Sequence, residues 1–474
     1  MSVRAMKPRQ RLKLRVAFIA SEVVPFAKTG GLADVAGSLP PALAGLGIDV
    51  RTVMPKYRQV IAEHNTIQIG KDLAVDFIEY RKYFDREALY GDRFGDYPDN
   101  LERFTYFCKS VLTRLMTIDF KPDIIHCNDW QSALIPVYLK TTFKDDPFFA
   151  RTRSMLTIHN LAYQGLFDKG LFPTLGLDGR YFGIDGLEFY DKINLLKGGI
   201  LFADGITTVS PSYAQEIQTK EFGCGLEGVL RTRANDLEGV INGIDYRVWD
   251  PATDTHIARQ FTVRTLSDKG FNKVDLQRTA ALKVDRQIPV FGIISRLADQ
   301  KGLDLISAIV TDLLKKDIQL VILGTGEDKY HLLYEKMAKL NPGKVSINLR
   351  FDATLAKKIY AGCDFFLMPS RYEPCGLGQM ISMRYGTIPI VRLTGGLRDT
   401  VSDAGDDGSR GNGFTFTAYE APALRDAVMR ALAAFKNKKV WRKLQVRAMS
   451  CDFSWERSAL RYAELYAKLL RKRC

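Results

Sequence analysis

Two cations lie close together at a point where a buried strand is expected to give way to a helix. Arg296 and Lys301 follow the apolar run 289–294. Arginine offers a planar fork to phosphate oxygens and lysine offers a compact charge, so the pair could neutralise a departing diphosphate. Two solvated surface cations would have the same spacing. The residue types alone leave both interpretations open.

Paired glycines precede an expected helix at two other points of the chain. Gly30 and Gly31 follow Lys28 and Thr29 near the start, and Gly395 and Gly396 follow Thr394. Glycine allows the backbone to approach a ligand closely, and the free N–H groups at a helix start favour an anion. Both loops therefore predict phosphate contacts, with a plain glycine turn as the alternative for each.

A carboxylate and a thiol stand before another expected helix start. Glu373 and Cys375 follow the apolar run 365–368. A helix start lowers the pKa of a cysteine, so a thiolate nucleophile is conceivable, but no histidine lies nearby in the sequence to act as its base. A glutamate that hydrogen-bonds sugar hydroxyls is easier to defend. A structural carboxylate beside a buried thiol is the alternative.

Polar and aromatic residues end two expected strands in the first half of the chain. Asp129 and Trp130 follow one strand, and His159 and Tyr163 follow the next. Aromatic faces can stack on sugar rings, and carboxylates can bond their hydroxyls. Core packing remains the alternative for Trp130, and a lone histidine is usually a satisfied core residue. The alternative to core packing is a sugar site formed by these residues.

Several nucleotide-binding signatures are absent from the sequence. Gly324 and Gly326 follow a strand, but Lys329 stands where a dinucleotide fingerprint needs its third glycine. The sequence contains neither a G-x-x-x-x-G-K-[ST] loop nor a D-x-D motif. Charge on leaving phosphates would then be met by Arg, Lys and helix ends, and we expect no metal.

Short apolar runs separated by helical stretches position all these residues. A helix is expected over about 32–46, with Pro40 and Pro41 predicted to break or bend it, and helical periodicity dominates from about 420. Runs of this length between helices predict βαβ units in a parallel sheet. The expected strands are 16–20, 48–54, 123–127, 154–158 and 205–209, then 289–294, 319–323, 345–349, 365–368 and 388–391.

The break between the two series of expected strands, after 205–209 and before 289–294, predicts two doubly wound α/β halves. The segment 242–287 lies between them and is the expected hinge. Ligands of open parallel sheets bind beyond the carboxyl ends of the strands. Two such sheets facing each other would make a cleft lined by both sets of loops.

Charge and cysteine content narrow the class of protein. The chain has 474 residues and a net charge of +14, with six cations and no acid among residues 4–15. Solubility or a phosphate pocket explains the excess of cations better than nucleic-acid binding, because no basic run is interleaved with aromatics.

No apolar run is long enough for a membrane span, and the first residues of the chain lack the pattern of a signal peptide. Seven scattered cysteines without C-x-x-C predict reduced thiols and a cytoplasmic protein.

Five motifs in this order resemble the bacterial glycogen synthases and plant starch synthases. The resemblance covers about Val16 to Leu470, and it is specific because the motifs occur together. They are Lys28-Thr29-Gly30-Gly31-Leu32-Ala33-Asp34-Val35, His159-Asn160-Leu161-Ala162-Tyr163-Gln164-Gly165, Ser295-Arg296-Leu297 with Gln300-Lys301-Gly302, Glu373-Pro374-Cys375-Gly376-Leu377, and Thr394-Gly395-Gly396-Leu397 with Asp399-Thr400.

The resemblance implies a GT-B architecture, two Rossmann-like domains facing each other across a deep cleft. Residues 1–245 would form the starch synthase catalytic domain on the acceptor side, and residues 246–454 the nucleotide-sugar donor side. A final helix within 455–474 would pack back onto the first domain. The resemblance also implies a retaining transfer with no metal and no other cofactor.

The same resemblance assigns roles by position. Arg296 and Lys301 would hold the donor diphosphate, while Glu373 and His159 would bind the transferred glucose. These four are the expected catalytic residues. The expected donor contacts are Lys28, Gly30, Gly31, Asn242, Phe351, Cys375, Gly376, Leu377, Thr394, Gly395 and Gly396, with the ring of Phe351 against the nucleotide base. The expected acceptor contacts are Asp129, Trp130 and Tyr163.

Three positions depart from the family pattern. Asn128 and Gln131 stand on either side of the Asp-Trp pair, where family members often have histidine, and Phe351 stands where tyrosine is also found. None of these changes touches the phosphate residues.

Together these observations predict a glycogen synthase that transfers glucose from ADP-glucose to the non-reducing end of an α-1,4-glucan. UDP-glucose as donor, a small sugar acceptor, or a non-catalytic glucan-binding protein on the same fold are the alternatives. The expected partners are the nucleotide sugar and the glucan, with no nucleic acid and no membrane.

Overall fold

The computed structural model describes residues 13–472, which form two compact units. Unit 1 contains residues 13–207, 223–238 and 458–472, and unit 2 contains residues 208–222 and 239–457. Each unit is therefore assembled from separate stretches of the chain. The basic segment before Lys13 and the residues Arg473 and Cys474 lie outside the described range. No helix within that range is long and apolar enough to span a membrane.

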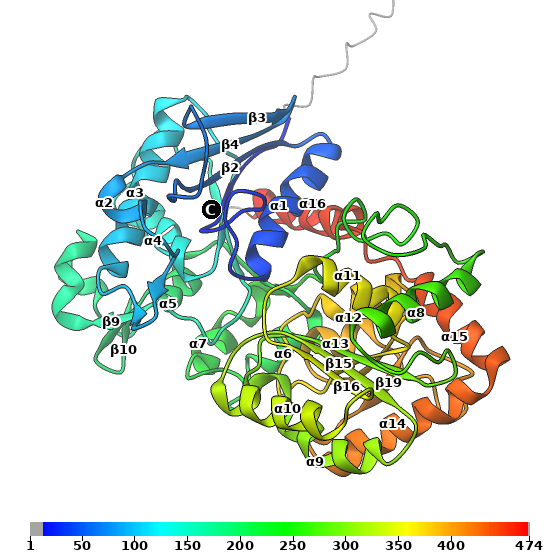
Figure 1. The fold of residues 1–474 in the computed structure, drawn as a ribbon. Coiled ribbons are helices and arrows are strands. Elements are labelled where there is room, and N and C mark those ends of the chain that lie inside the picture. Colours follow the sequence, from blue (N-terminus) through cyan, green and yellow to red (C-terminus); the bar gives the residue numbers. More distant parts are fainter. Residues whose placement is uncertain (1–12, 473–474) are drawn as a thin grey trace, which may run out of the picture. The chain divides into compact units, whose positions relative to one another are not determined.

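Unit 1 is built on a mostly parallel sheet, which has eight strands within the described residues (Figure 1). The strands are β1 (Arg15–Ile19), β2 (Asp49–Pro55), β3 (Thr66–Gly70), β4 (Leu73–Ile78), β7 (Ile124–Asn128), β8 (Arg153–Ile158), β12 (Gly205–Thr208) and β13 (Leu237–Gly239). Their order is β13-β12-β8-β7-β1-β2-β4-β3. β1 pairs in parallel with β2 and β7, while β3 is an antiparallel edge strand beside β4.

Helices and small hairpins complete unit 1. The residues from Val16 to Ala20 are fully buried, as expected for a central strand covered on both faces. The helices are α1 (Gly31–Gly45), α2 (Arg81–Phe84), α3 (Asn100–Thr117), α4 (Leu134–Lys140), α5 (Leu195–Phe202) and α7 (Glu227–Thr232). The short strands are β5 (Gly91–Asp92), β6 (Gly95–Asp96), β9 (Leu166–Asp168), β10 (Glu188–Phe189) and β11 (Lys192–Asn194).

Unit 2 is built on a parallel sheet, with six strands among the described residues. The strands are β14 (Val290–Ile294), β15 (Gln319–Leu323), β16 (Val345–Asn348), β17 (Phe365–Met368), β18 (Ile388–Arg392) and β19 (Phe414–Phe416). Their order is β16-β15-β14-β17-β18-β19, and every neighbouring pair is parallel. The first strand therefore lies beside the fourth, as in doubly wound nucleotide-binding sheets.

Helices cover both faces of this second sheet (Figure 1). Val321 and Leu323 pack toward α8 and α11, while Leu320 and Ile322 pack toward α9 and α14. This alternation follows from the period of two along a strand. The helices of unit 2 are α6 (Pro211–Glu216), α8 (Lys269–Thr279), α9 (Leu303–Leu314), α10 (Asp328–Leu340), α11 (Ala353–Gly362), α12 (Gly378–Arg384), α13 (Gly395–Thr400), α14 (Ala421–Lys436) and α15 (Lys438–Met449).

Short 3-10 turns complete the list of elements. They are η1 (Trp130–Ser132), η2 (Lys169–Leu175), η3 (Gly179–Tyr181), η4 (Ala234–Asp236), η5 (Leu266–Asp268) and η6 (Asp299–Lys301).

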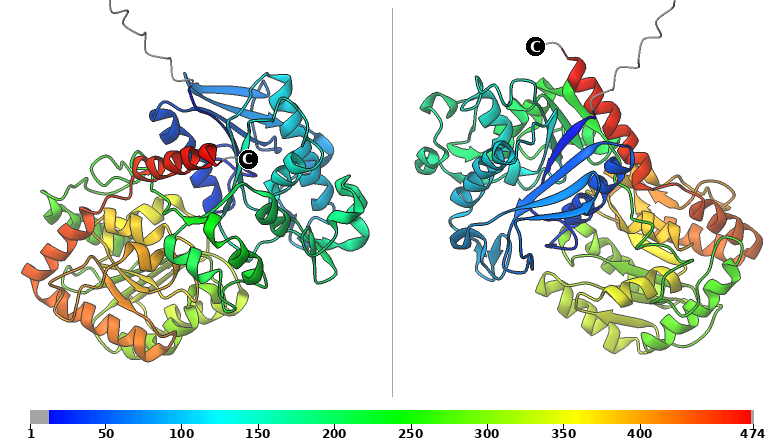
Figure 2. Two further views of the ribbon diagram at one scale, coloured as in Figure 1. Left: turned by 180° about the vertical axis from the view of Figure 1, so that it is seen from behind. Right: turned by 90° about the horizontal axis from the view of Figure 1, so that it is seen from above.

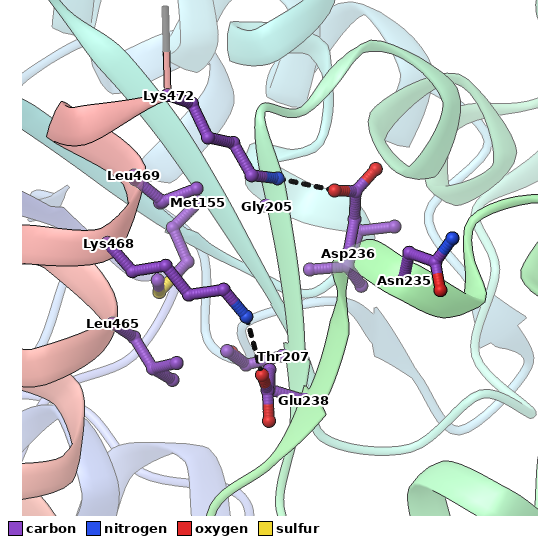
Figure 3. A pocket seen from close by; sticks show the side chains of 11 residues that line it. Met155, Gly205, Thr207, Asn235, Asp236, Glu238, Leu465, Lys468, Leu469 and Lys472 are labelled. Carbon is purple, nitrogen blue, oxygen red and sulfur yellow. Dashed lines mark hydrogen bonds and ion pairs between the residues drawn. The ribbon is translucent and has the colours of Figure 1, made fainter.

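The final helix, α16 (Trp455–Arg471), packs against the sheet of unit 1 from Ser458 onward (Figure 2). Tyr466 hydrogen-bonds the buried His126 Nδ1 through its hydroxyl at 2.7 Å. Lys468 donates to Glu238 at 2.9 Å, and Lys472 pairs with Asp236 (Figure 3). The helix is thus held by hydrogen bonds and ion pairs to unit 1.

Of the two outcomes predicted at Pro40 and Pro41, a break of the first helix does not occur. α1 continues through Pro40 and Pro41 to Gly45. A proline removes one backbone hydrogen bond, but Leu39 and Leu43 are fully buried on the inner face of α1. Tertiary packing of that face therefore keeps the helix intact.

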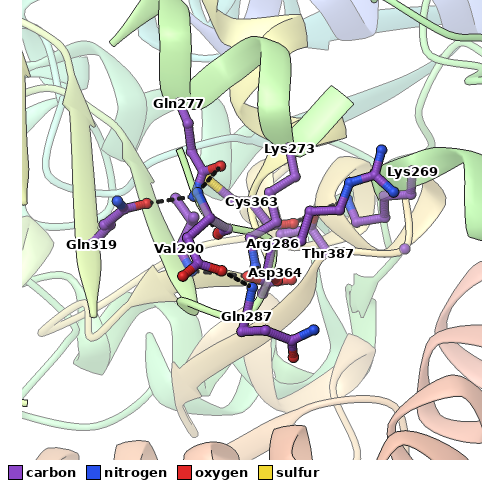
Figure 4. Close-up of polar contacts among 12 residues, drawn as sticks. Lys269, Lys273, Gln277, Arg286, Gln287, Val290, Gln319, Cys363, Asp364 and Thr387 are labelled. Carbon is purple, nitrogen blue, oxygen red and sulfur yellow. Dashed lines mark hydrogen bonds and ion pairs between the residues drawn. The ribbon is translucent and has the colours of Figure 1, made fainter. Parts of the chain in front are cut away.

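The expected hinge segment 242–287 belongs to unit 2, where α8 is firmly anchored (Figure 4). Lys269 is buried and donates to Ala361 O at 2.8 Å and to Thr387 Oγ1 at 2.7 Å. Lys273 donates to Asp364 Oδ2 at 2.7 Å. Burial lowers the pKa of Lys269 to about 7. These contacts make the segment part of the core of unit 2 rather than a linker.

Candidate active site

The strand order of unit 2 creates a crevice at the carboxyl ends of β14 and β17. Connections leave these two neighbouring strands toward opposite faces of the sheet, and ligands of such folds bind at this switch point. A pocket of about 210 Å³ lies there. It is lined by Ile293, Ile294, Ser295, Arg296, Lys301, Tyr360, Leu367, Met368, Ser370, Glu373, Gly376, Leu377 and Gly378. The structure therefore brings Arg296, Lys301, Glu373, Gly376 and Leu377 together.

Lys301 and Glu373 form an ion pair within this pocket. Lys301 Nζ donates to Glu373 Oε2 at 2.7 Å, and the side chains are 18% and 8% exposed. Ser370 Oγ donates to the same carboxylate oxygen at 3.0 Å. Gly302 has φ +68°, and a Cβ there would collide with the carbonyl oxygen of Pro369. Glycine at this position lets the Lys301 turn lie directly against the end of β17.

Arg296 lies on the exposed side of the same pocket. Its Nη2 donates to Gln300 Oε1 at 3.2 Å. Gln300 in turn donates to the carbonyl oxygen of Tyr372 at 3.2 Å and accepts from the backbone of Arg371 at 2.8 Å. The guanidinium group of Arg296 thus remains largely open to solvent. Gln300 connects the loop after β14 with the loop after β17.

Cys375 lies buried behind the Glu373 turn. Burial raises the pKa of its thiol to about 12, and the thiol hydrogen-bonds the backbone of Asn242. A thiol with this pKa is protonated at neutral pH, so the environment opposes a thiolate nucleophile. Asn242 is itself buried.

The loop Thr394–Gly396 braces the backbone of the Glu373 turn. Gly396 N donates to the carbonyl oxygens of Glu373 and Pro374, each at 3.1 Å. A Cβ on Gly395 would collide with the carbonyl oxygen of Glu373, and one on Gly396 with that of Cys375. Gly395 also has φ +43°, a conformation that favours glycine.

A glutamate from α6 binds the other side of this loop. Glu216 Oε1 accepts from Gly395 N at 2.9 Å, and both carboxylate oxygens lie 3.2 Å from Thr394 Oγ1. Burial raises the pKa of Glu216. Both amides of the glycine pair therefore already have protein acceptors.

Unit 1 has its own switch point, where β1 lies beside β7. Asn128 Nδ2 donates to the carbonyl oxygen of Ile19 at 2.9 Å, so its Oδ1 is free to accept. His159 Nε2 lies 2.9 Å from Asn128 Oδ1, which places the imidazole proton on Nε2. Asp129 Oδ1 accepts from the backbone N–H of His159 at 2.7 Å. The carboxyl ends of β7 and β8 are thereby joined in one polar cluster.

Desolvation shifts the titration of this cluster. It lowers the pKa of His159 to about 3 and raises the pKa of Asp129 to about 7, with the charge of Glu22 adding to the second shift. His159 is neutral at physiological pH as a result. Asp129 also has φ +55°, a strained conformation for a non-glycine residue that is typical of functional sites.

The loop after β1 wraps around the carboxylate of Glu22. Glu22 Oε2 accepts from Thr29 N at 2.5 Å and from Gly30 N at 3.1 Å, while Oε1 accepts from Thr29 Oγ1 at 2.9 Å and from Tyr90 Oη at 3.0 Å. Lys28 Nζ pairs with Asp34 at 2.7 Å on the exposed side. Gly30 and Gly31 have no other atom near the position of a Cβ.

Three residues predicted to contact ligands, Phe351, Tyr163 and Trp130, are either exposed or packed against other aromatic rings. Phe351 is 86% exposed and Tyr163 is 53% exposed. Trp130 stacks edge-on to Phe104 and Phe167, and a Cβ on Gly165 would strike its ring. The core-packing interpretation of Trp130 therefore describes much of its surroundings.

Sequence reasoning missed two anchoring residues, Glu22 and Glu216. Glu22 could have been noticed as a buried carboxylate between a strand end and a glycine loop. Asn128 was noted for its place beside Asp129, but its hydrogen bond to His159 was not predicted. No signal in the sequence connects Glu216 with a loop 178 residues away.

Solved structures share this fold. The catalytic domain of Starch Synthase IV from Arabidopsis thaliana, bound to ADP and acarbose, has 34% identity and a TM-score of 0.88, covering 97% of this chain and 100% of that one. Sucrose-phosphate synthase from Thermosynechococcus elongatus has 18% identity and a TM-score of 0.63, covering 96% and 99%, and shows the fold alone. Two Rossmann-like units, each with a polar switch-point site, define a glycosyltransferase of the GT-B class.

Sequence comparisons narrow this class. The family "Starch synthase catalytic domain" matches residues 15–232, and "Glycosyl transferases group 1" matches residues 278–443. Glycogen synthases of Geotalea uraniireducens and Thermotoga petrophila are 49% and 48% identical, each over 97% of this chain and at least 99% of their own length. The chain belongs to the glycogen synthase and starch synthase family. It is therefore a glucosyltransferase with a nucleotide-sugar donor and a glucan acceptor.

Proposed function

We propose that this glycogen synthase transfers glucose from ADP-glucose, with retention, to the non-reducing end of an α-1,4-glucan. The observation that carries the proposal is the pocket of unit 2, in which Arg296, Lys301 and Glu373 line the switch point of a nucleotide-binding sheet. The Arabidopsis relative, whose structure holds ADP, supports the choice of adenine nucleotide.

The donor diphosphate is proposed to bind Arg296 and Lys301. The glycosidic bond weakens as negative charge builds on the diphosphate, and cations fixed beside it stabilise that charge in the transition state. Lys301 is already held by Glu373 at 2.7 Å, so it is positioned before the donor arrives. The open fork of Arg296 suits two phosphate oxygens.

Glu373 is proposed to accept hydrogen bonds from hydroxyls of the transferred glucose, within the turn formed by Cys375, Gly376 and Leu377. Within the described residues, the buried Ser295 Oγ and Asn242 Oδ1 have no hydrogen-bond partner. Buried polar atoms are normally satisfied, so these two support a polar ligand in this part of unit 2.

The polar cluster of unit 1 is proposed to serve the sugar as well. His159 is neutral and held by Asn128 and Asp129, so it can hydrogen-bond a hydroxyl without adding charge. Lys28, Gly30 and Gly31 remain proposed donor contacts, and Asp129, Trp130 and Tyr163 remain proposed acceptor contacts. Phe351 is exposed enough for its ring to meet a nucleotide base.

The experiment that tests the proposal measures turnover with each nucleotide sugar. The purified protein is incubated with labelled ADP-glucose or UDP-glucose and glycogen, and label in the polymer is counted. We expect incorporation from ADP-glucose at a clearly higher kcat/KM than from UDP-glucose, and an α-linked product. Preference for UDP-glucose would overturn the donor assignment, and labelled small sugars in place of polymer would overturn the acceptor assignment.

We also propose that the enzyme works in the cytoplasm. Cys108, Cys127, Cys363 and Cys375 are buried as free thiols in the described structure, a state that a reducing compartment preserves. Thiol titration of the denatured protein purified under argon should count seven reactive groups, and a lower number would indicate disulfides.

A further inference from the structure

We infer that Glu216 is a positioning residue, which fixes the backbone of Glu373 through the loop Thr394–Gly396. The inference rests on the proposed role of Glu373 in binding the transferred glucose.

The first link joins Glu216 to the loop. Its carboxylate accepts from Gly395 N at 2.9 Å and lies 3.2 Å from Thr394 Oγ1 through both oxygens. Thr394 is 1% exposed, so water does not replace these contacts easily. Removing the carboxylate would leave two donors in a poorly solvated place, and the loop would have to move to satisfy them.

The second link joins the loop to the Glu373 turn. Gly396 N is shared between the carbonyl oxygens of Glu373 and Pro374, and neither Gly395 nor Gly396 has room for even a methyl group. The loop and the Glu373 turn therefore cannot move independently, because closely packed interiors transmit displacements. A shift of the loop therefore shifts the backbone that carries Glu373.

The third link is the carboxylate itself. Glu373 Oε2 meets Lys301 Nζ at 2.7 Å and Ser370 Oγ at 3.0 Å, and these groups come from the segments that follow β14 and β17. A displaced Glu373 backbone would pull the carboxylate away from partners that stay in place. Misplacement by about 1 Å can cost about a hundredfold in rate.

A second contact between α6 and α13 allows the positioning of Glu373 to be distinguished from simple attachment of the two helices. Ser212, also on α6, donates to Asp399 through its backbone N at 3.0 Å and its hydroxyl at 2.6 Å. This contact joins the same two helices without touching the loop before Gly395. Substitution of Ser212 is therefore a matched control for substitution of Glu216.

The test compares three variants of the full-length enzyme by kcat, donor KM and melting temperature. We expect E216A to lower kcat about ten- to a hundredfold. E216Q should recover most of that loss, because its amide oxygen can still accept from Gly395 N. S212A should keep the kcat of the wild type. A folded E216A enzyme with wild-type kcat would overturn the inference, as would an equal loss of kcat in S212A.

A double-mutant cycle separates this inference from the role of Glu373. In an E373Q background that retains measurable activity, E216A should cause little further loss, because the group it positions has already been changed. A full additional loss would overturn the inference, while wild-type activity of E373Q would overturn the role of Glu373 itself. If E216A does not fold, T394V replaces it, since it removes the hydroxyl that meets Glu216, and a wild-type kcat for T394V counts against the inference.

Discussion

The same tetrapeptide, Thr-Gly-Gly-Leu, begins one helix in each unit. Residues 29–32 lead into α1 and residues 394–397 lead into α13. In both loops a glutamate binds the threonine hydroxyl and a glycine amide, Glu22 in unit 1 and Glu216 in unit 2. The same four-residue sequence therefore binds a glutamate carboxylate from its own unit in both places.

The surroundings of the two loops differ. Gly30 and Gly31 have open space where a Cβ would stand, whereas Gly395 and Gly396 are pressed against backbone carbonyls of the Glu373 turn. The first loop can therefore receive a ligand, and the second braces a neighbouring turn. A glycine pair therefore indicates that another group approaches the backbone closely, and the fold decides whether that group is a ligand or another segment of the chain.

The origin of each glutamate also differs. Glu22 precedes its loop by seven residues, while Glu216 is 178 residues from Thr394. The stretch 208–222, which joins unit 2 although unit 1 surrounds it in sequence, delivers Glu216 to its loop. The long-range contact is thus part of what makes unit 2 discontinuous.

The largest expected effect comes from adding a methyl group to the second loop. G395A should destabilise the protein by at least about 2 kcal/mol, because a positive φ alone costs roughly 1–2 kcal/mol and the methyl group also collides with Glu373 O. Urea denaturation measures the change. The matched G31A variant should stay within about 0.5 kcal/mol of wild type. Equal stability of the two variants would show that the two glycine pairs are equally tolerant of a side chain.

Removing the first carboxylate should have an intermediate effect. E22A leaves Thr29 N, Gly30 N and the Tyr90 hydroxyl without their acceptor, which should cost about 1–3 kcal/mol of stability. Denaturation of E22A and E22Q side by side measures it, and E22Q should lose less. Wild-type stability of E22A would mean that the carboxylate does not organise the loop.

The G31A variant should show a smaller effect, seen in activity and not in stability. If the first loop receives the donor, a methyl group there should raise the KM for ADP-glucose several-fold while the melting temperature stays unchanged. Steady-state kinetics at saturating glycogen measures it. Unchanged KM would show that the open space beside Gly31 is not used by the donor.

A pH dependence of stability is expected in unit 1. Because the pKa of Asp129 is raised to about 7, the folded state binds more protons than the unfolded state between about pH 4 and pH 7. Stability contributed by this group is therefore lost as the pH rises through that range. D129N should flatten this slope relative to wild type in denaturation series, and parallel curves would contradict the shift.

The sequence predicted the fold class and the places of the sites because both depend on local patterns. Largely buried strands such as β1 and β14 appear as nearly continuous apolar runs, and the cations and carboxylates after them lie at the switch points. The edge strand β3 went unpredicted because its side chains are mostly exposed, and β19 because it has only three residues.

The remaining features could not be predicted because they join segments far apart in the chain. The pairing of Lys301 with Glu373 spans 72 residues, and the contact of Glu216 with Thr394 spans 178. That the amides of Gly395 and Gly396 are bonded within unit 2 could not be predicted either, because nothing local in the sequence reveals these contacts.

The cations of the unit 2 pocket are proposed to stabilise the departing diphosphate, and substitution of Arg296 removes one of them. Arg296 is exposed and makes one side-chain hydrogen bond to Gln300, so R296A should fold normally. Transfer from ADP-glucose to glycogen should fall about 10²–10³-fold in kcat, while binding of glycogen is retained. A folded R296A enzyme that transfers glucose at the wild-type rate would show that Arg296 does not stabilise the leaving diphosphate.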